Sequence, residues 1–439
     1  MSSVRNNELS LPQAFFIAAA FTSSFDIFLV LNFGFNFRIA QLFLLIPIGL
    51  VAVRAIGHKV ILPLGTGWLL LWTISIFIFL PNTSFPERSL GYFAWLLISV
   101  LTIFVCVHLF SNSSAILVLA RWYVYSFVFV AIFGLLQFVS PIIGFGDLLL
   151  IQQWWIPGIL PRINGFSYEP SFFATYLIMG WVVCAHLVEA KSSLFVDTHL
   201  KIYFLLITLS LILSSSRMGL LMMMLWYVQY PFRFVVRLIG GHFNMRFAKI
   251  TLISFAVVLL LVATMLYFFG FSELVFLFEG LGIFGGVAHS VDTRNNSTRD
   301  TFLIFMNSPI IGYSLGGVAP AIANLHGVTN LNFETIKEFE GNSVFVEVLA
   351  ASGLFGFIPF AMFIFYMVRK PLHLARKVSS EQSSILVALT LALIFELMIL
   401  QFNQNILRPY LWMHIAILAA CYSAYKRSRN VVGVARDRI

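Results

Sequence analysis

Long apolar runs recur along nearly the whole chain, and they limit the possible folds more than any other feature. A helix needs roughly 20 mainly apolar residues to cross a hydrocarbon core about 30 Å thick. Of the 439 residues, 60% are hydrophobic and only 10% are charged, which differs strongly from the composition of an ordinary soluble domain. The sequence therefore predicts an all-α, polytopic membrane protein that forms a single integral membrane domain.

We predict twelve transmembrane helices from these runs. The first run is counted as a span and not as a cleaved signal, because no small-x-small site closes it and similar runs follow. The seventh and eighth spans are separated at "SSSR", residues 214–217. The predicted spans cover about residues 11–31, 37–53, 61–80, 90–110, 116–138, 168–188, 200–215, 218–232, 249–270, 343–368, 384–402 and 409–425.

Basic residues indicate how the spans are oriented, because Lys and Arg accumulate in cytoplasmic loops. With twelve spans, the basic loops after the second, eighth and tenth spans and the basic tail 426–439 all fall on one side. The segment 271–342 falls on the other side and holds seven acidic and three basic residues. We therefore expect both termini in the cytoplasm, and a large extracytoplasmic loop at 271–342 that forms a cap between the ninth and tenth helices.

Ionisable residues gather where this topology places the outer face of the membrane. They are Arg162, Glu169, Arg217, Arg294 and Arg299. An arginine at the centre of a span costs roughly 2.5–3.5 kcal/mol, so an arginine kept near lipid usually faces a cavity or a partner. The planar guanidinium binds phosphate oxygens through paired, charge-assisted hydrogen bonds. Several such groups on one face predict a binding site for a lipid diphosphate.

Each of these residues also has a purely structural interpretation. Arg162 and Glu169 could pair with each other and hold their loop onto the sixth helix. Arg217 could extend from a tight helical hairpin to the membrane surface, while Arg294 and Arg299 could be solvated surface residues. Both interpretations are open from the sequence alone.

Other ionisable residues lie within the predicted spans. They are Asp26, His108, His186, Glu396 and His414. An ionisable residue inside a membrane is a candidate for function, but no motif joins these five. A proton relay and ordinary hydrogen bonds between helices are therefore both possible.

Four segments share the order and spacing of a known family. They are "RINGFSYEPSFFATYL" (162–177), "SSSRMGLLM" (214–222), "STRDTFLIFMNSPIIGYSLGG" (297–317) and "GNSVFVEVLAASGLFGF" (341–357). Together they resemble the O-antigen polymerase and O-antigen ligase superfamily of bacterial membrane proteins. The resemblance implies a GT-C-like fold of ten to fourteen helices, with outward-facing chemistry on undecaprenyl-diphosphate-linked glycans.

The resemblance also implies an activity, namely an inverting glycosyl transfer that needs no metal and no cofactor. A glycan would leave its lipid diphosphate and join the acceptor sugar of another lipid-linked repeat. Arg162, Glu169, Arg217 and Arg299 match family motif positions. We expect Arg217 and Arg299 to stabilise the leaving diphosphate, Glu169 to accept the acceptor proton and Arg162 to hold the second lipid-linked substrate. Further expected substrate-binding residues are Arg294, His326 and Asn342.

One departure from the family favours a polymerase over a ligase. Ligases of this family carry a histidine, commonly as His-Asn, where this chain reads Gly341-Asn342-Ser343. A general base would then have to come from His326, Glu340 or Glu169.

Glycine and proline predict how the chain turns near the expected site. Gly165 and Pro170 fit a kinked start of the sixth helix that would aim Glu169 into a cavity. In the cap, Gly312, Gly316 and Gly317 suggest tight turns where small residues would let a glycan approach the backbone. The alternative is that these glycines only allow the loop to turn and have no part in binding.

The expected location is a bacterial inner membrane, with the active site facing the periplasm. The expected partners are undecaprenyl-diphosphate-linked oligosaccharides, membrane lipid and a chain-length regulator, and no nucleic acid. The product would be O-antigen, capsule or exopolysaccharide. Three alternatives remain: a ligase that transfers O-antigen to the lipid A core, a transporter or flippase that relies on midplane residues such as Asp26 and Glu396, and a non-catalytic subunit of an export complex.

Overall fold

The computed structural model describes most of the chain in a largely helical fold. The described residues are 9–32, 36–57, 60–145, 149–156, 158–239, 245–280, 289–328, 330–341, 343–402 and 406–436. The helices are α1 (Leu11–Phe21), α2 (Ile39–Ala55), α3 (Thr66–Ile78), α4 (Pro86–Leu109), α5 (Ser113–Val139), α6 (Pro170–Glu189), α7 (Asp197–Ser214), α8 (Arg217–Ile239), α9 (Met245–Gly280), α10 (His289–Asn307), α11 (Val318–Leu325), α12 (Phe333–Lys337), α13 (Val344–Ala375), α14 (Ser380–Ile399) and α15 (Pro409–Arg436). Two short antiparallel hairpins are formed by β1 (Val30–Asn32) with β2 (Asn36–Arg38) and by β3 (Gln153–Ile156) with β4 (Leu160–Arg162).

Within the described residues, six helices are long and apolar enough to cross a membrane. These are α4, α5, α6, α7, α13 and α14. The prediction of an all-α, membrane-embedded protein is thus confirmed, while the number of twelve spans stays a prediction. Shorter apolar helices include α1, α2 and α3.

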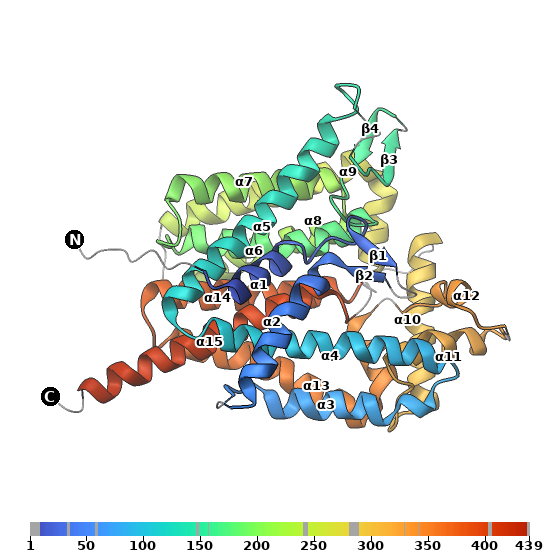
Figure 1. Ribbon diagram of the computed structural model, residues 1–439. Coiled ribbons are helices and arrows are strands. Elements are labelled where there is room, and N and C mark those ends of the chain that lie inside the picture. The colour runs from blue at the N-terminus through green and yellow to red at the C-terminus, as the bar shows by residue number, and fades with distance from the viewer. Residues whose placement is uncertain are drawn as a thin grey trace.

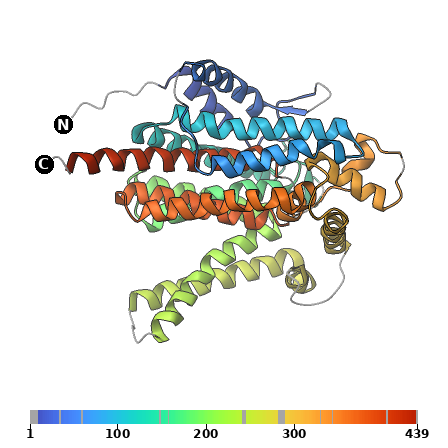
Figure 2. The ribbon, with the colours of Figure 1, turned by 90° about the horizontal axis from the view of Figure 1, so that it is seen from below.

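The helices form a bundle with different features at its two ends (Figure 1). The start of α1 and the end of α15 lie toward one end, on the left of the view, and both hairpins and helices α10, α11 and α12 lie toward the other. The central helices are α6, which is buried from Phe173 to Ala185, and α15, which is buried from Pro409 to Cys421. Along their length α6 packs on α14 and α15 packs on α4, whereas α8 and α9 pack mainly on each other and extend away from the bundle (Figure 2).

The first predicted span, 11–31, is too long, because α1 ends at Phe21. After this helix, the hydroxyls of Thr22 and Ser23 donate to the carbonyl oxygens of Ala18 and Ala20, at 2.8 and 2.9 Å. The N–H groups of Asp26 and Ile27 then donate to the carbonyl oxygen of Phe166, at 2.9 and 3.1 Å, and not to a carbonyl of a preceding helical turn. Asp26 therefore lies in a non-helical segment and not inside a span, which corrects the prediction made for it.

The serines at 214–216 divide α7 from α8, as predicted. Ser215 has φ +51°, in the left-handed region, and ends α7. The hydroxyl of Ser216 accepts from the N–H of Gly219 at 3.4 Å, which is the contact of an N-cap residue. Arg217 is consequently the first residue of α8.

The predicted cap, 271–342, is helical in much of its described length. Residues 271–280 continue α9, and α10, α11 and α12 follow, with a 3-10 turn at Leu315–Gly317. Gly312, Gly316 and Gly317 serve close packing and not glycan approach, which corrects that expectation. A Cβ on Gly312 would lie 2.1 Å from the carbonyl carbon of Ala351 in α13, and one on Gly316 would lie 2.5 Å from Cα of Ser89 in α4.

Candidate functional site

Charged residues from distant parts of the chain are linked to one another by ion pairs or by their charges. Two of them, Arg38 and Arg162, belong to the two hairpins, which lie at one end of the bundle (Figure 1). We call this group the arginine cluster. Its members are Asp26, Arg38, Arg162, Glu169, Arg217 and Arg408.

A buried aspartate joins two of the arginines. Asp26 Oδ1 lies 2.8 Å from Arg38 Nε, and its Oδ2 lies 3.0 Å from Arg408 Nη1. The Asp26 side chain is 1% exposed and that of Arg408 is 7% exposed, while the side chain of Arg38 is 24% exposed. Buried charges are costly unless they are paired, so these contacts fix three segments of the chain against one another.

The same aspartate connects this ion pair to the loop before α6. The N–H of Asp26 donates to the carbonyl oxygen of Phe166 at 2.9 Å. The guanidinium carbon of Arg408 lies 3.9 Å from the centre of the Phe172 ring, in the first turn of α6. A cation over an aromatic face is stabilised by the ring quadrupole, and this contact places Arg408 beside the start of α6.

Arg162 connects the second hairpin to the turn between α7 and α8. Its Nη1 donates to Gln153 Oε1 at 2.9 Å, across the β3–β4 pair, and its Nη2 donates to the carbonyl oxygen of Ser215 at 3.4 Å. Arg217 follows Ser215 by two residues. Burial lowers the pKa of Arg162, and the positive charge of Arg217 lowers it further, while Glu169 acts in the opposite direction. The two guanidinium groups are therefore close enough to repel each other.

Hydrogen bonds with Gln137 of α5 hold the loop that carries Glu169. Gln137 Oε1 accepts from the N–H of Gly165 at 2.7 Å, and Gln137 Nε2 donates to the Gly165 carbonyl oxygen at 3.0 Å. Gly165 has φ +55°, and a Cβ there would lie 2.5 Å from Cδ2 of Phe173. Only glycine fits this conformation and this space, so Gly165 sets the turn of the chain before α6. That this turn aims Glu169 into a cavity stays a prediction.

Glu169 is the N-cap residue of α6, and Pro170 is the first residue of the helix. The Glu169 side chain is exposed, and its Oε2 accepts from Ser171 Oγ at 2.9 Å. Its charge acts on both Arg162 and Arg408. Burial lowers the pKa of Arg408, but Asp26 and other nearby groups, Glu169 among them, outweigh burial, so the pKa is raised. Glu169 is thus a solvent-accessible carboxylate whose charge acts on two guanidinium groups.

Four members of the cluster stand where a helix begins. Arg38 precedes α2, Glu169 precedes α6, Arg217 begins α8 and Arg408 precedes α15. A helix N-terminus carries partial positive charge and unsatisfied N–H groups, so an acidic residue is favoured there and an arginine is not. Three arginines at such positions raise the local positive potential, and with four arginines against two carboxylates the cluster suits an anion of more than one negative charge.

Arg38 and Arg408 belong to the cluster but were not predicted as site residues. The signal was present, because the predicted topology puts Arg408 in an outer loop directly before an apolar run, as it does Arg217, and puts Arg38 at the outer end of the second predicted span. Arg408 lies 382 positions from Asp26 in the sequence, whereas Arg38 lies only 12 positions from it. A search for local motifs does not detect the contact between Asp26 and Arg408.

The remaining predicted site residues lie in or near the cap. Arg299 is exposed on α10, and no contact joins it to the arginine cluster among the described residues. His326 Nε2 lies 2.8 Å from Asp300 Oδ2. Arg294 lies within α10, but its side chain is outside the described part of the structure, and Asn342 lies outside the described residues altogether.

Glu340 connects the cap to the cluster indirectly. Its Oε1 accepts from Arg88 Nη2 at 2.7 Å, and its carbonyl oxygen accepts from Ser297 Oγ of α10 at 2.8 Å. The charge of Glu340 also acts on Arg408. The pairing with Arg88 makes Glu340 less suited to accept a proton than the open Glu169.

No model of a known protein family matches this chain, and no curated protein sequence is significantly similar to it.

Proposed function

We propose that the protein is a polymerase-type glycosyltransferase that uses polyprenyl-diphosphate-linked oligosaccharides. The observation that carries the proposal is the arginine cluster, in which four guanidinium groups from residues 38 to 408 share one end of the bundle with one open carboxylate. A diphosphate is the group that such an arrangement fits best, because guanidinium forks pair with phosphate oxygens and do not lose their charge.

The proposed reaction is a single displacement at the anomeric carbon of the donor sugar. The acceptor hydroxyl oxygen forms the new glycosidic bond while the bond to the phosphate oxygen breaks, and the lipid diphosphate leaves with the electron pair. Glu169 takes the hydroxyl proton, a role that contributes typically 10²- to 10⁴-fold. Attack opposite the leaving group inverts the anomeric centre.

The arginines would stabilise the negative charge that develops on the leaving diphosphate. Arg217 and Arg162 are the proposed ligands of the diphosphates, and the ion pair with Asp26 holds Arg408 and Arg38 beside them. Arg299, with Arg294, His326 and Asn342, would contact substrate from the cap. Their place in the reaction rests on the resemblance in the sequence and not on a contact with the cluster.

We propose further that the cluster faces the periplasm of a bacterial cell and that both termini are cytoplasmic. In support, the arginine cluster and the acidic cap share one end of the bundle, while the basic end of α15 lies at the other (Figure 1). This arrangement agrees with the rule that basic segments stay in the cytoplasm.

Turnover by the purified protein in lipid nanodiscs tests the proposal. The substrate is a polyprenyl-diphosphate-linked repeat unit, and the product is measured as lipid-linked dimers and longer chains. Arg217→Ala should lower turnover by about 10²-fold or more, the loss seen when a group that stabilises developing charge is removed. Arg54→Ala, an exposed arginine at the end of α2, is the control and should retain full activity.

The same assay separates the proposal from a transporter. A transporter would not extend the glycan chains. It would depend on buried groups such as Glu396, which is fully buried in α14. Normal chain growth in Arg162→Ala and Arg217→Ala, with loss in Glu396→Gln alone, would contradict the site proposed here.

A further inference from the structure

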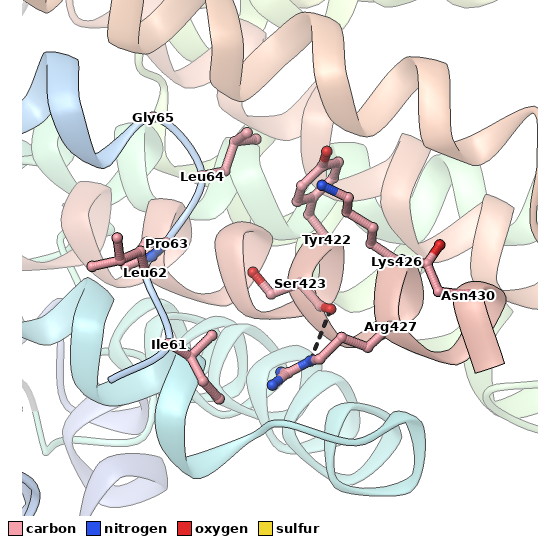
Figure 3. A pocket seen from close by; sticks show the side chains of 10 residues that line it. All are labelled: Ile61, Leu62, Pro63, Leu64, Gly65, Tyr422, Ser423, Lys426, Arg427 and Asn430. Atoms are coloured by element: carbon pink, nitrogen blue, oxygen red, sulfur yellow. Dashed lines mark hydrogen bonds between the residues drawn. The ribbon is translucent and has the colours of Figure 1, made fainter. Parts of the chain in front are cut away.

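A second polar site lies at the opposite end of the bundle from the arginine cluster. It is a cavity of about 370 Å³ where α15 passes the segment that precedes α3. One wall consists of residues 61–65, and the other is one face of α15, as Figure 3 shows. The residues from α15 are Tyr422, Ser423, Lys426, Arg427 and Asn430.

The α15 wall is basic. Lys426 Nζ lies 5.8 Å from the centre of the Tyr422 ring, and Arg427 Nε donates to the Ser423 carbonyl oxygen at 3.2 Å. That bond holds the guanidinium in place but leaves Nη2 of Arg427 buried with no hydrogen-bond partner in the described part of the chain. A buried donor without a partner is costly, and burial also lowers the pKa of Arg427. The described lining residues are apolar, neutral or basic.

The opposite wall is apolar and reaches the outside of the protein. Leu62, which lines the cavity, is 67% exposed, and Val60 beside it is 45% exposed. These side chains stand at the end of the bundle, where apolar surface without a protein cover is suited to lipid chains. One cavity therefore combines a cationic interior with an apolar rim.

We propose that this cavity binds an anionic phospholipid. Its phosphate would accept from Arg427 Nη2 and from Lys426, and its acyl chains would lie over Leu62. The polar groups of Ser423 and Asn430 would contact the rest of the head group. The anionic leaflet of a cytoplasmic membrane face attracts basic segments of this kind, and the lipid would join α15 to the segment before α3.

Thermal unfolding of the purified full-length protein in a neutral detergent tests this proposal. Phosphatidylglycerol should raise the melting temperature, and phosphatidylcholine should not, because its net charge is zero. Soluble glycerol 3-phosphate should give no shift, and a shift equal to that of the lipid would overturn the proposal in favour of a soluble phosphate ester.

A pair of variants identifies the cavity. The double variant Lys426→Gln/Arg427→Gln should bind phosphatidylglycerol about tenfold or more weakly, because two charged contacts are lost. Arg429→Gln changes an exposed arginine of the same helix that does not line the cavity and should bind as wild type. An equal loss of phosphatidylglycerol affinity in the double variant and in Arg429→Gln would mean that general surface charge attracts the lipid. That result would overturn the proposal.

A measurement on the wild-type protein keeps the test independent of how the variants fold. A phosphatidylglycerol analogue with a photoreactive head group should label peptides that contain residues 61–65 or 422–430. Labelling that is spread over the bundle, or labelling that phosphatidylcholine prevents equally well, would contradict a specific site.

Discussion

Gly165 shows how a single residue shapes the proposed site. Its φ of +55° and its contact with Phe173 set the path of the loop that ends at Glu169. In the sequence, Gly165 and Pro170 predicted a kinked start of the sixth helix. The partner that holds the turn, Gln137 of α5, was not predictable, since its role depends on three-dimensional packing.

We expect Gly165→Ala to destabilise the protein by more than the conformational cost alone. A left-handed φ costs a non-glycine residue about 1–2 kcal/mol, and the contact at 2.5 Å with Phe173 adds the cost of forcing the core apart. Gly158→Ala is the matched control, because Gly158 has φ +75° with no atom within 4 Å of its Cβ position. Equal melting temperatures for the two variants would show that the Phe173 contact carries no strain.

The buried Asp26–Arg408 ion pair joins the segment after α1 to the residue before α15. Arg408→Ala should lower the free energy of unfolding by about 3–5 kcal/mol, because it leaves Asp26 partly unpaired in a buried position. Lys201→Ala removes one member of the exposed pair with Asp197, whose side chains are 61% and 63% exposed, and should cost no more than about 1 kcal/mol. Similar losses for both variants, measured by denaturant unfolding in micelles, would contradict the structural role given to Asp26.

Helices and turns account for most of what was predictable from the sequence. The lengths of the apolar runs predicted where helices form, and the "SSSR" segment predicted the break between α7 and α8. The end of α1 was missed because a hydropathy profile does not show that Asp26 pairs with two arginines. The helices α10, α11 and α12 were missed because α10 and α12 are largely polar, and because the apolar stretch Leu315–Leu325 is too short to count as a span.

The α7–α8 turn gives a prediction about this break. Ser215→Gly should leave the protein as stable or raise the free energy of unfolding by about 1 kcal/mol, because glycine adopts φ +51° without strain. The Ser215 hydroxyl makes no hydrogen bond within the described chain, so nothing is lost with it. Ser214→Gly, in the last turn of α7, should instead cost up to about 1 kcal/mol. The opposite order of melting temperatures would contradict a left-handed residue at 215.

The protein as a whole has two chemically different ends, and its orientation in the membrane is open to direct test. Tyr168 is 50% exposed beside Glu169, and Arg429 is exposed near the end of α15. The native Cys106, Cys184 and Cys421 are buried, so they give little background with a thiol reagent. A reagent that does not cross membranes should label Tyr168→Cys in intact spheroplasts and label Arg429→Cys only after lysis. Labelling of Arg429→Cys from outside would invert the proposed topology.

Binding of undecaprenyl diphosphate to the purified protein in nanodiscs tests the central claim most directly. The account predicts that wild type binds the diphosphate more tightly than undecaprenyl monophosphate, and that Arg162→Ala and Arg217→Ala each weaken diphosphate binding about tenfold or more while Arg54→Ala leaves it unchanged. Equal affinity for the two lipids, or diphosphate binding unaffected by loss of Arg162 and Arg217, would contradict it.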